Sequence, residues 1–299
     1  MRTRPHQIML TVFCLFVFFA SFGLESTFAT PQIYWTTGDK IQRSNLDGSG
    51  IEDVVTGLYQ PTDIAIDLSV GKMYWTDLGT GTGTGTIQRA NLDGTGIEDI
   101  VTTGLSLPWG IALDISAEKM YWTDIGTDTI QRANLDGTNA EIITAGIPYP
   151  EGIALDISAG KIYWTDRANH QIQRSDLDGS NVETILSPLS ASGMTLDAAA
   201  GKMYWIGSIG IGRANLDGTQ AEGVIGGSFK TGDIVIDAAN NKLYGTNGRH
   251  IFSANLDGTN VEYFDIDRAG YGIAITPEPT TILLLGLGVL IVRKKQLKD

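Results

Sequence analysis

The chain has 299 residues, of which 34 are Asp or Glu and 21 are Lys or Arg, so its formal net charge is −13 at pH 7. This acidic balance argues against nucleic acid or anionic lipid as a partner, because both are polyanions. Cys14 is the one cysteine of the sequence, which excludes an intramolecular disulfide. The fold must therefore depend on burial of a hydrophobic core.

The first 29 residues have the three parts of a secretory signal peptide. Arg2 and Arg4 precede an apolar run from Ile8 to Phe22, and small residues flank Phe28 in the sequence Thr27-Phe28-Ala29. We predict cleavage after residue 29 and a mature chain that starts at Thr30. The alternative is a retained membrane anchor, for which the apolar run is short.

The central part of the chain is an internal repeat with a period of about 40 residues. Each unit contains a Tyr that is followed by Trp in all copies but the last, and then a Leu-Asp-Gly turn. The tyrosines are Tyr34, Tyr74, Tyr121, Tyr163, Tyr204 and Tyr244, and the turn glycines are Gly48, Gly94, Gly137, Gly179, Gly218 and Gly258. The sequence therefore contains six units.

Each unit reads as four short β-strands. In the third unit the strand-like runs are 110–114, 119–123, 130–134 and 140–143, which are rich in β-branched and aromatic residues and separated by Gly, Asn and Asp. Four strands per unit and six units predict an all-β, six-bladed β-propeller over residues 30–276. Small residues are expected where the inner strands converge, Trp between adjacent blades, and Asp-Gly in a tight hairpin.

The two ends of the repeat region are complementary. The mature chain opens on a second strand at Ile33-Tyr34-Trp35, and the missing inner strand recurs at Tyr271-Gly272-Ile273-Ala274-Ile275. We predict that this C-terminal strand pairs into the N-terminal blade and closes the ring, which removes two exposed sheet edges.

Residues 277–299 form a separate tail. Pro277-Glu278-Pro279 is followed by an apolar run from Ile282 to Val292 and by Arg293-Lys294-Lys295. As a permanent transmembrane helix the run is marginal, because 11 residues at 1.5 Å each span only about 17 Å. The order of the three parts resembles the bacterial PEP-CTERM sorting signal. That resemblance implies the export and sorting machinery as a partner, membrane contact before processing, and a cell-envelope, surface or matrix destination. A simple C-terminal membrane tail is the alternative.

The repeat resembles the YWTD repeat, the class B repeat of the low-density-lipoprotein receptor family. The motif is intact in three copies: Tyr74-Trp75-Thr76-Asp77, Tyr121-Trp122-Thr123-Asp124 and Tyr163-Trp164-Thr165-Asp166. It is altered in the copies that start at Tyr34, Tyr204 and Tyr244, where any hydrogen bonding between blades by the motif Asp is in doubt. The resemblance implies a six-bladed propeller used for protein recognition and not for catalysis.

Positions that the repeat does not dictate are the candidates for function. The residues just before or at the start of the inner strands should surround the mouth of the central channel, and aromatic and acidic side chains at a concave mouth are typical of a binding site. The candidate binding residues are Thr62, Asp63, Trp109, Glu151, Ser192, Asp233 and Tyr271. Solvated loop residues without a ligand are the alternative.

Little in the sequence points to catalysis. Beyond the predicted signal peptide the histidines are His170 and His250, far apart in the ring, and no zinc-ligand or Ser/His/Asp spacing occurs. We therefore predict a non-enzymatic, exported protein that holds a protein or an extracellular polysaccharide. The alternatives are a calcium-dependent hydrolase of the six-bladed lactonase type, with Asp63, Glu151 and Asp233 near the metal, and a purely structural spacer. No cofactor is otherwise expected.

Overall fold

The computed structural model describes residues 30–80, 85–187, 189–227, 229, 232–264, 266 and 270–276. The predicted signal peptide and sorting segment, residues 1–29 and 277–299, lie outside these ranges. No helix of the described part is long and apolar enough to cross a membrane.

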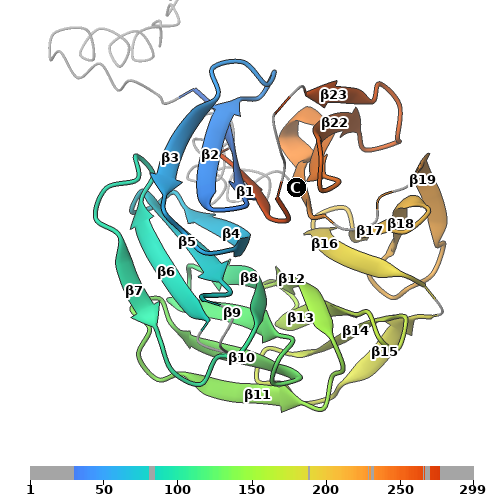
Figure 1. Ribbon diagram of the computed structural model, residues 1–299. Helices are drawn as coiled ribbons and strands as arrows, with labels where there is room; N and C mark the ends of the chain where they lie inside the picture. Colours follow the sequence, from blue (N-terminus) through green and yellow to red (C-terminus); the bar gives the residue numbers. More distant parts are fainter. Residues whose placement is uncertain are drawn as a thin grey trace, which may run out of the picture. The chain divides into compact units, whose positions relative to one another are not determined.

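The described residues form six antiparallel sheets of four strands around a central axis (Figure 1), which confirms the predicted propeller. Blade 1 consists of β24 (Ile273–Ile275), β1 (Gln32–Thr37), β2 (Lys40–Asn45) and β3 (Glu52–Thr56). Blade 2 consists of β4 (Pro61–Asp67), β5 (Lys72–Asp77), β6 (Thr86–Asn91) and β7 (Glu98–Val101). Blade 3 consists of β8 (Pro108–Asp114), β9 (Lys119–Asp124), β10 (Thr129–Asn134) and β11 (Glu141–Ala145).

The later blades repeat this plan. Blade 4 consists of β12 (Pro150–Asp156), β13 (Lys161–Asp166), β14 (Gln171–Asp176) and β15 (Glu183–Leu186). Blade 5 consists of β16 (Ala191–Asp197), β17 (Lys202–Gly207), β18 (Gly210–Asn215) and β19 (Glu222–Gly226). Blade 6 consists of β20 (Ile234–Asp237), a short 3₁₀ turn η1 (Ala238–Asn240), β21 (Lys242–Thr246), β22 (Ile251–Asn255) and β23 (Glu262–Phe264).

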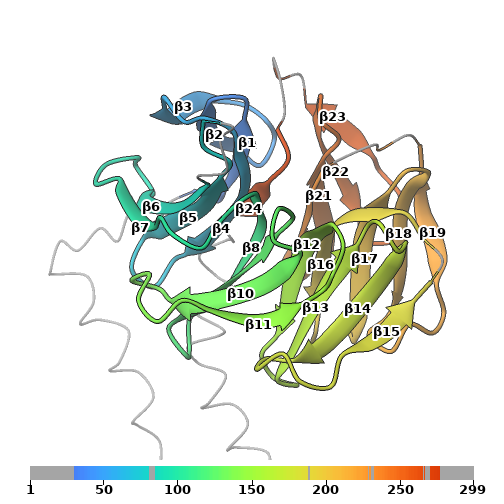
Figure 2. The same cartoon turned by 60° about the horizontal axis from the view of Figure 1, so that its bottom comes forward.

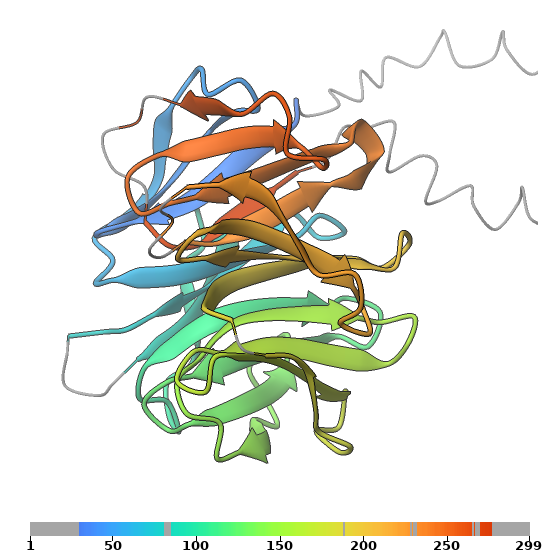
Figure 3. The same cartoon turned by 90° about the vertical axis from the view of Figure 1, so that its right-hand side faces the viewer.

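The ring closes as the sequence predicts. The innermost strands contact one another in the order β4, β8, β12, β16, β20 and β24, and β24 returns to β4. Strand β24 pairs with β1, with Ile273 opposite Trp35 and Ile275 opposite Ile33. Figure 2 shows β24 in red beside β1 in blue, and in the side view of Figure 3 the last strands of the chain again lie next to the first.

Apolar side chains from two adjacent blades share each core cluster. Trp122 of blade 3, for example, is fully buried against Tyr74 and Ile87 of blade 2. Small residues bring the inner strands together: a Cβ on Gly110 would lie 2.4 Å from the carbonyl oxygen of Glu151 in the next blade. All six Leu-Asp-Gly turns have their glycine at positive φ, such as +83° at Gly137, a conformation that side chains disfavour.

Candidate functional site: the mouth of the central channel

The predicted binding residues stand at the beginning of the innermost strands. Thr62, Asp63, Trp109, Glu151 and Ser192 lie near the starts of β4, β8, β12 and β16, whereas Asp233 and Tyr271 come just before β20 and β24. Antiparallel pairing puts the loops after the second strands on the same face, because Pro108 is opposite Asp124 in blade 3. This end of the axis is called the mouth.

Motif threonines fix the backbone of the mouth. The Oγ1 of Thr123 accepts a hydrogen bond from Gly110 N (2.8 Å) and donates to the carbonyl of Glu151 in the next blade (2.7 Å). The corresponding donations to the next blade come from Thr36, Thr76, Thr165 and Thr246 and reach the carbonyls of Thr62, Trp109, Ser192 and Tyr271. The motif thus holds each of these mouth residues through its backbone and leaves its side chain free to vary.

Two of the three intact motif aspartates bind the segment that links their blade to the preceding one. Asp124 accepts hydrogen bonds from the backbone of Ser106 (2.8 Å) and Leu107 (3.1 Å), in the segment that links blades 2 and 3. Asp77 likewise accepts from Tyr59 and Gln60. The direct bond to the next blade is made by the motif Thr, so the loss of the motif Asp leaves it intact, as Thr36 and Thr246 show.

In blade 5 the motif Thr is replaced by Ile206, and another hydroxyl takes over. Ser192 Oγ donates to the carbonyl of Gly232 in blade 6 (3.2 Å), and Gly193 N donates to the same oxygen (3.0 Å). Ser192 is therefore occupied in holding two blades together. It does not line the cavity that the other predicted residues surround.

Those other six residues do come together. Thr62, Asp63, Trp109, Glu151, Asp233 and Tyr271, together with glycines of the inner strands, line a cavity of about 20 Å³. This volume suits about one water molecule. The mouth is therefore nearly filled by its own side chains and is no deep pocket.

Two aromatic rings lie across the mouth. The ring centroids of Trp109 in blade 3 and Tyr271 in blade 1 are 5.0 Å apart with an interplanar angle of 57°. Tyr271 is 38% exposed, so the pair presents apolar surface to the outside. Aromatic residues with one accessible face are typical anchors of protein interfaces.

Glu151 has a buried carboxylate, and one of its two oxygens has no hydrogen-bond partner among the described residues. The residue is 1% exposed, and its Oε1 accepts a hydrogen bond of 2.6 Å from Arg167, which also stacks over Tyr149. No described residue hydrogen-bonds to Glu151 Oε2. Burial raises the pKa of Glu151, and the charge and hydrogen bond of Arg167 oppose this shift.

Asp63 and Asp233 meet at the axis. They occupy the position that is Gly110, Gly152, Gly193 and Gly272 in the other blades, and their carboxyl groups hydrogen-bond to each other. Asp63 also accepts from Ile111 N of blade 3 (2.7 Å), and Asp233 from Ile273 N of blade 1. Burial raises the pKa of Asp63 to about 7, and burial together with the charge of Asp63 raises the pKa of Asp233 well above its usual value. The pair therefore shares at least one proton near neutral pH.

The sequence interpretation singled out both aspartates but not their contact. The signal was present, because Asp replaces Gly in two of six units at the one position where side chains converge on the axis. Among the described residues, no group of three His, Cys, Asp or Glu is placed to hold a metal ion. Calcium at the mouth stays a prediction of the hydrolase alternative.

A larger hollow of about 650 Å³ lies in blade 5 and was missed by the sequence interpretation. In blade 2, Trp75, Gln88 and Asp99 lie opposite one another on three neighbouring strands, and Trp75 Nε1 is 2.8 Å from Gln88 Oε1. The equivalent residues in blade 5 are Trp205, Gly212 and Gly223. The ring of Trp205 covers Gly212, whereas a Cβ on Gly223 would meet nothing within 4 Å, and both glycines line the hollow. These two glycines, at positions that carry side chains in the other units, were the available signal.

Comparisons with known proteins agree with this architecture. The family model for the low-density lipoprotein receptor repeat class B matches residues 71–115, 118–157 and 160–189, and the model for the PEP-CTERM protein-sorting motif matches residues 276–295. The chain is a six-bladed β-propeller that contains YWTD (class B) repeats. It also carries a PEP-CTERM sorting motif, which implies export to the bacterial cell envelope or surface.

Two solved structures show the same fold. The first is described as the crystal structure of a nidogen/laminin complex; it has 25% sequence identity and a TM-score of 0.75, and the match covers 82% of this chain and 98% of that chain. The second is TolB from Acinetobacter baumannii, with 15% identity, a TM-score of 0.66 and coverage of 84% and 67%, which supports the fold alone. A comparison with curated protein sequences finds no match.

Proposed function

We propose that this propeller is a non-catalytic binding module of the bacterial surface that holds a protein partner at the mouth, around Trp109, Glu151 and Tyr271. The observation that carries the proposal is the nearly filled mouth: the exposed Tyr271 and the half-buried Trp109 pack against each other and line a cavity of about 20 Å³. A small-molecule substrate needs a pocket of several hundred Å³. An aromatic platform on a rigid ring instead suits a partner that binds from outside.

The likeness to a propeller solved in a nidogen/laminin complex supports a protein as the partner. A polysaccharide and a purely structural spacer remain outcomes of the test. The hydrolase alternative needs a metal that several oxygen ligands would hold, and Glu151 already pairs with Arg167.

The test replaces the aromatic pair in the exported full-length protein. The double variant Trp109→Ala/Tyr271→Ala should lose most of its retention at the cell surface, whereas Tyr263→Ala, an exposed aromatic on the outer strand β23, should not. A photoreactive phenylalanine analogue at Tyr271 should give cross-linked species whose added mass glycosidase does not remove and whose tryptic peptides include those of a second protein. Unchanged retention of the double variant would exclude the mouth as the site, and an added mass that glycosidase removes would identify a polysaccharide.

A further inference from the structure

One oxygen of the Glu151 carboxylate, Oε2, is available to a ligand. Its Oε2 is buried, lacks a hydrogen-bond partner among the described residues, and belongs to a side chain that lines the cavity at the mouth. A buried carboxylate oxygen without a donor is unfavourable, and one water can satisfy it in the free protein. A ligand that supplies a stronger donor at this point would displace that water.

The charge of the mouth indicates what kind of donor fits. Arg167 offsets the negative charge of Glu151. The Asp63–Asp233 pair retains about one negative charge when it shares one proton. The rings of Trp109 and Tyr271 lie at the entrance, and aromatic faces attract cations. Acidic side chains and two aromatic faces around one small cavity are complementary to a single positive charge.

We propose that the mouth recognises one primary ammonium group, carried by a lysine side chain of the protein partner. The ammonium group enters beside Trp109 and Tyr271 and donates a hydrogen bond to Glu151 Oε2, with the Asp63–Asp233 pair in the lining of the same cavity. This inference rests on the proposed function, because it names the chemistry by which the same site selects its partner.

The size of the cavity separates the ammonium group from other cations. A cavity of about 20 Å³ admits a compact group that replaces one water, whereas a planar guanidinium with five donors needs a wider site. A calcium ion would need six to eight oxygen ligands. No group of three acidic or histidine side chains converges for it in the described part of the chain.

The experiment uses the purified full-length protein and a short blocked peptide, acetyl-Gly-Lys-Gly-amide. Titration followed by calorimetry should show binding. The same peptide with Nε-acetyl-lysine should bind with an affinity at least about tenfold lower, because a charge-assisted hydrogen bond is lost. The arginine peptide should also bind more weakly. Equal binding of lysine and acetyl-lysine peptides, or binding of calcium chloride that abolishes lysine binding, would overturn the inference.

A substitution at Glu151 tests whether the lysine peptide binds at this carboxylate. Glu151→Gln keeps the shape of the side chain and removes its charge, so lysine-peptide affinity should fall about tenfold. Asp93→Asn, in an exposed hairpin turn, should leave it unchanged. If the lysine peptide fails while the Trp109/Tyr271 variant still loses surface retention, the ammonium inference is wrong and the protein-binding function stands. If both results are negative, both proposals fall.

Discussion

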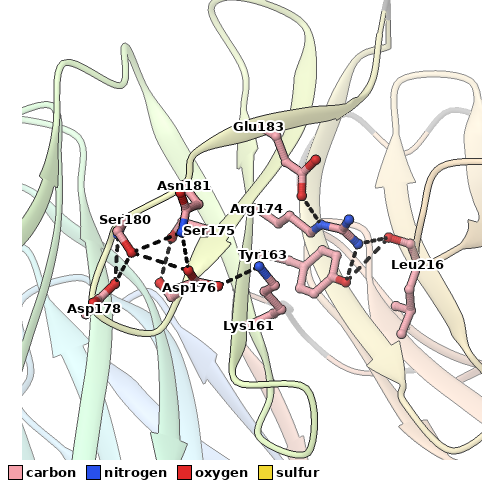
Figure 4. Close-up of polar contacts among 10 residues, drawn as sticks. All are labelled: Lys161, Tyr163, Arg174, Ser175, Asp176, Asp178, Ser180, Asn181, Glu183 and Leu216. Carbon is pink, nitrogen blue, oxygen red and sulfur yellow. Dashed lines mark hydrogen bonds and ion pairs between the residues drawn. The ribbon is translucent and has the colours of Figure 1, made fainter.

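The propeller is held together in two different ways at its six seams, the interfaces between successive blades. At the five interior seams an arginine of the third strand reaches the next blade and donates to the carbonyl of the Leu in its Leu-Asp-Gly turn. The five donors are Arg43, Arg89, Arg132, Arg174 and Arg213, at 3.0 to 3.1 Å from their acceptors. Figure 4 shows this contact for Arg174, which also pairs with Glu183 and lies next to Tyr163.

The closing seam, between blades 6 and 1, lacks this arginine bond. Ser253 stands where the other blades have arginine, and no bond from it to Leu46 is formed among the described residues. The bond from Thr246 Oγ1 to the carbonyl of Tyr271 (2.7 Å) links the two blades here as its equivalents do elsewhere. Within blade 1, β24 pairs with β1 from the opposite end of the chain, where Thr36 N donates to Gly272 O (3.1 Å) and Thr276 N to Gln32 O (2.9 Å). A buried cluster that includes Trp35, Tyr244 and Phe264 fills the interface. The closing seam thus lacks the arginine bond and depends on a strand that no hairpin joins to its partner β1.

Removal of the closing strand should have the largest effect. Deletion of residues 271–275 takes away β24 and the partner of Thr246, and exposes the inner edge of β1. We expect loss of the cooperative melting transition and aggregation, measured by circular dichroism and light scattering. A deletion variant that melts at the wild-type temperature would show that the closing seam does not depend on this strand.

A point variant tests how the closing strand β24 packs against β4 of blade 2 without shortening the chain. A Cβ on Gly272 would lie 2.4 Å from the Cα of Asp63, whereas a Cβ on Gly38 would meet nothing within 4 Å. Gly272→Ala should therefore lower the melting temperature clearly more than Gly38→Ala. Equal shifts would contradict the close approach of β24 to β4.

Much of this architecture was predictable from the sequence because the same local pattern occurs in all six units. Strand order, six blades, the closing strand and the Asp-Gly hairpins follow from local patterns that each unit repeats. The contacts between specific side chains were harder. Nothing in one unit indicates that Asp63 and Asp233, 170 positions apart, hydrogen-bond across the axis, or that Trp109 and Tyr271 close the mouth. Such contacts depend on the diameter of the finished ring, which local patterns do not encode.

The acidic pair bridges one seam of each kind, because Asp63 accepts from blade 3 and Asp233 from blade 1. The folded pKa of Asp63 is raised to about 7, against about 3.9 in the unfolded chain. The native state then holds a proton that the unfolded state releases between these values, so stability falls as pH rises through this window, by about 1.4 kcal/mol per pH unit and proton.

Asp63→Asn should flatten that dependence. Urea denaturation at pH 5 and pH 7 should show that the variant loses less stability than the wild type over this interval, while Glu151 and Arg167 remain the same in both proteins. Asp136→Asn is the control, because the hydrogen bonds of Thr138 lower the pKa of Asp136 and place its effect below about pH 4. Parallel pH profiles of wild type and Asp63→Asn would contradict a shared proton at the axis.

An interior seam is tested at its axial end by Thr123→Val. The change keeps the β-branched shape but removes the acceptor of Gly110 N and the donor to Glu151 O, both buried. We expect a loss of about 1–3 kcal/mol in the free energy of unfolding. Thr184→Val, on the exposed outer strand β15, is the matched control and should change it little. A loss no larger than that of the control would mean that the threonine bonds contribute little to the seam.

The smallest effect is expected when the arginine bond between blades is added at the closing seam or removed at an interior seam. Ser253 lies opposite Tyr244 and Glu262, as Arg174 lies opposite Tyr163 and Glu183. Ser253→Arg should therefore provide the closing seam with the missing bond to Leu46 and raise stability by about 0.5–1.5 kcal/mol. Arg174→Met, which keeps apolar contact but removes the donor, should lower it by a similar amount. If Ser253→Arg destabilises the protein while Arg174→Met is also destabilising, the closing seam excludes the arginine because its own packing already occupies that space.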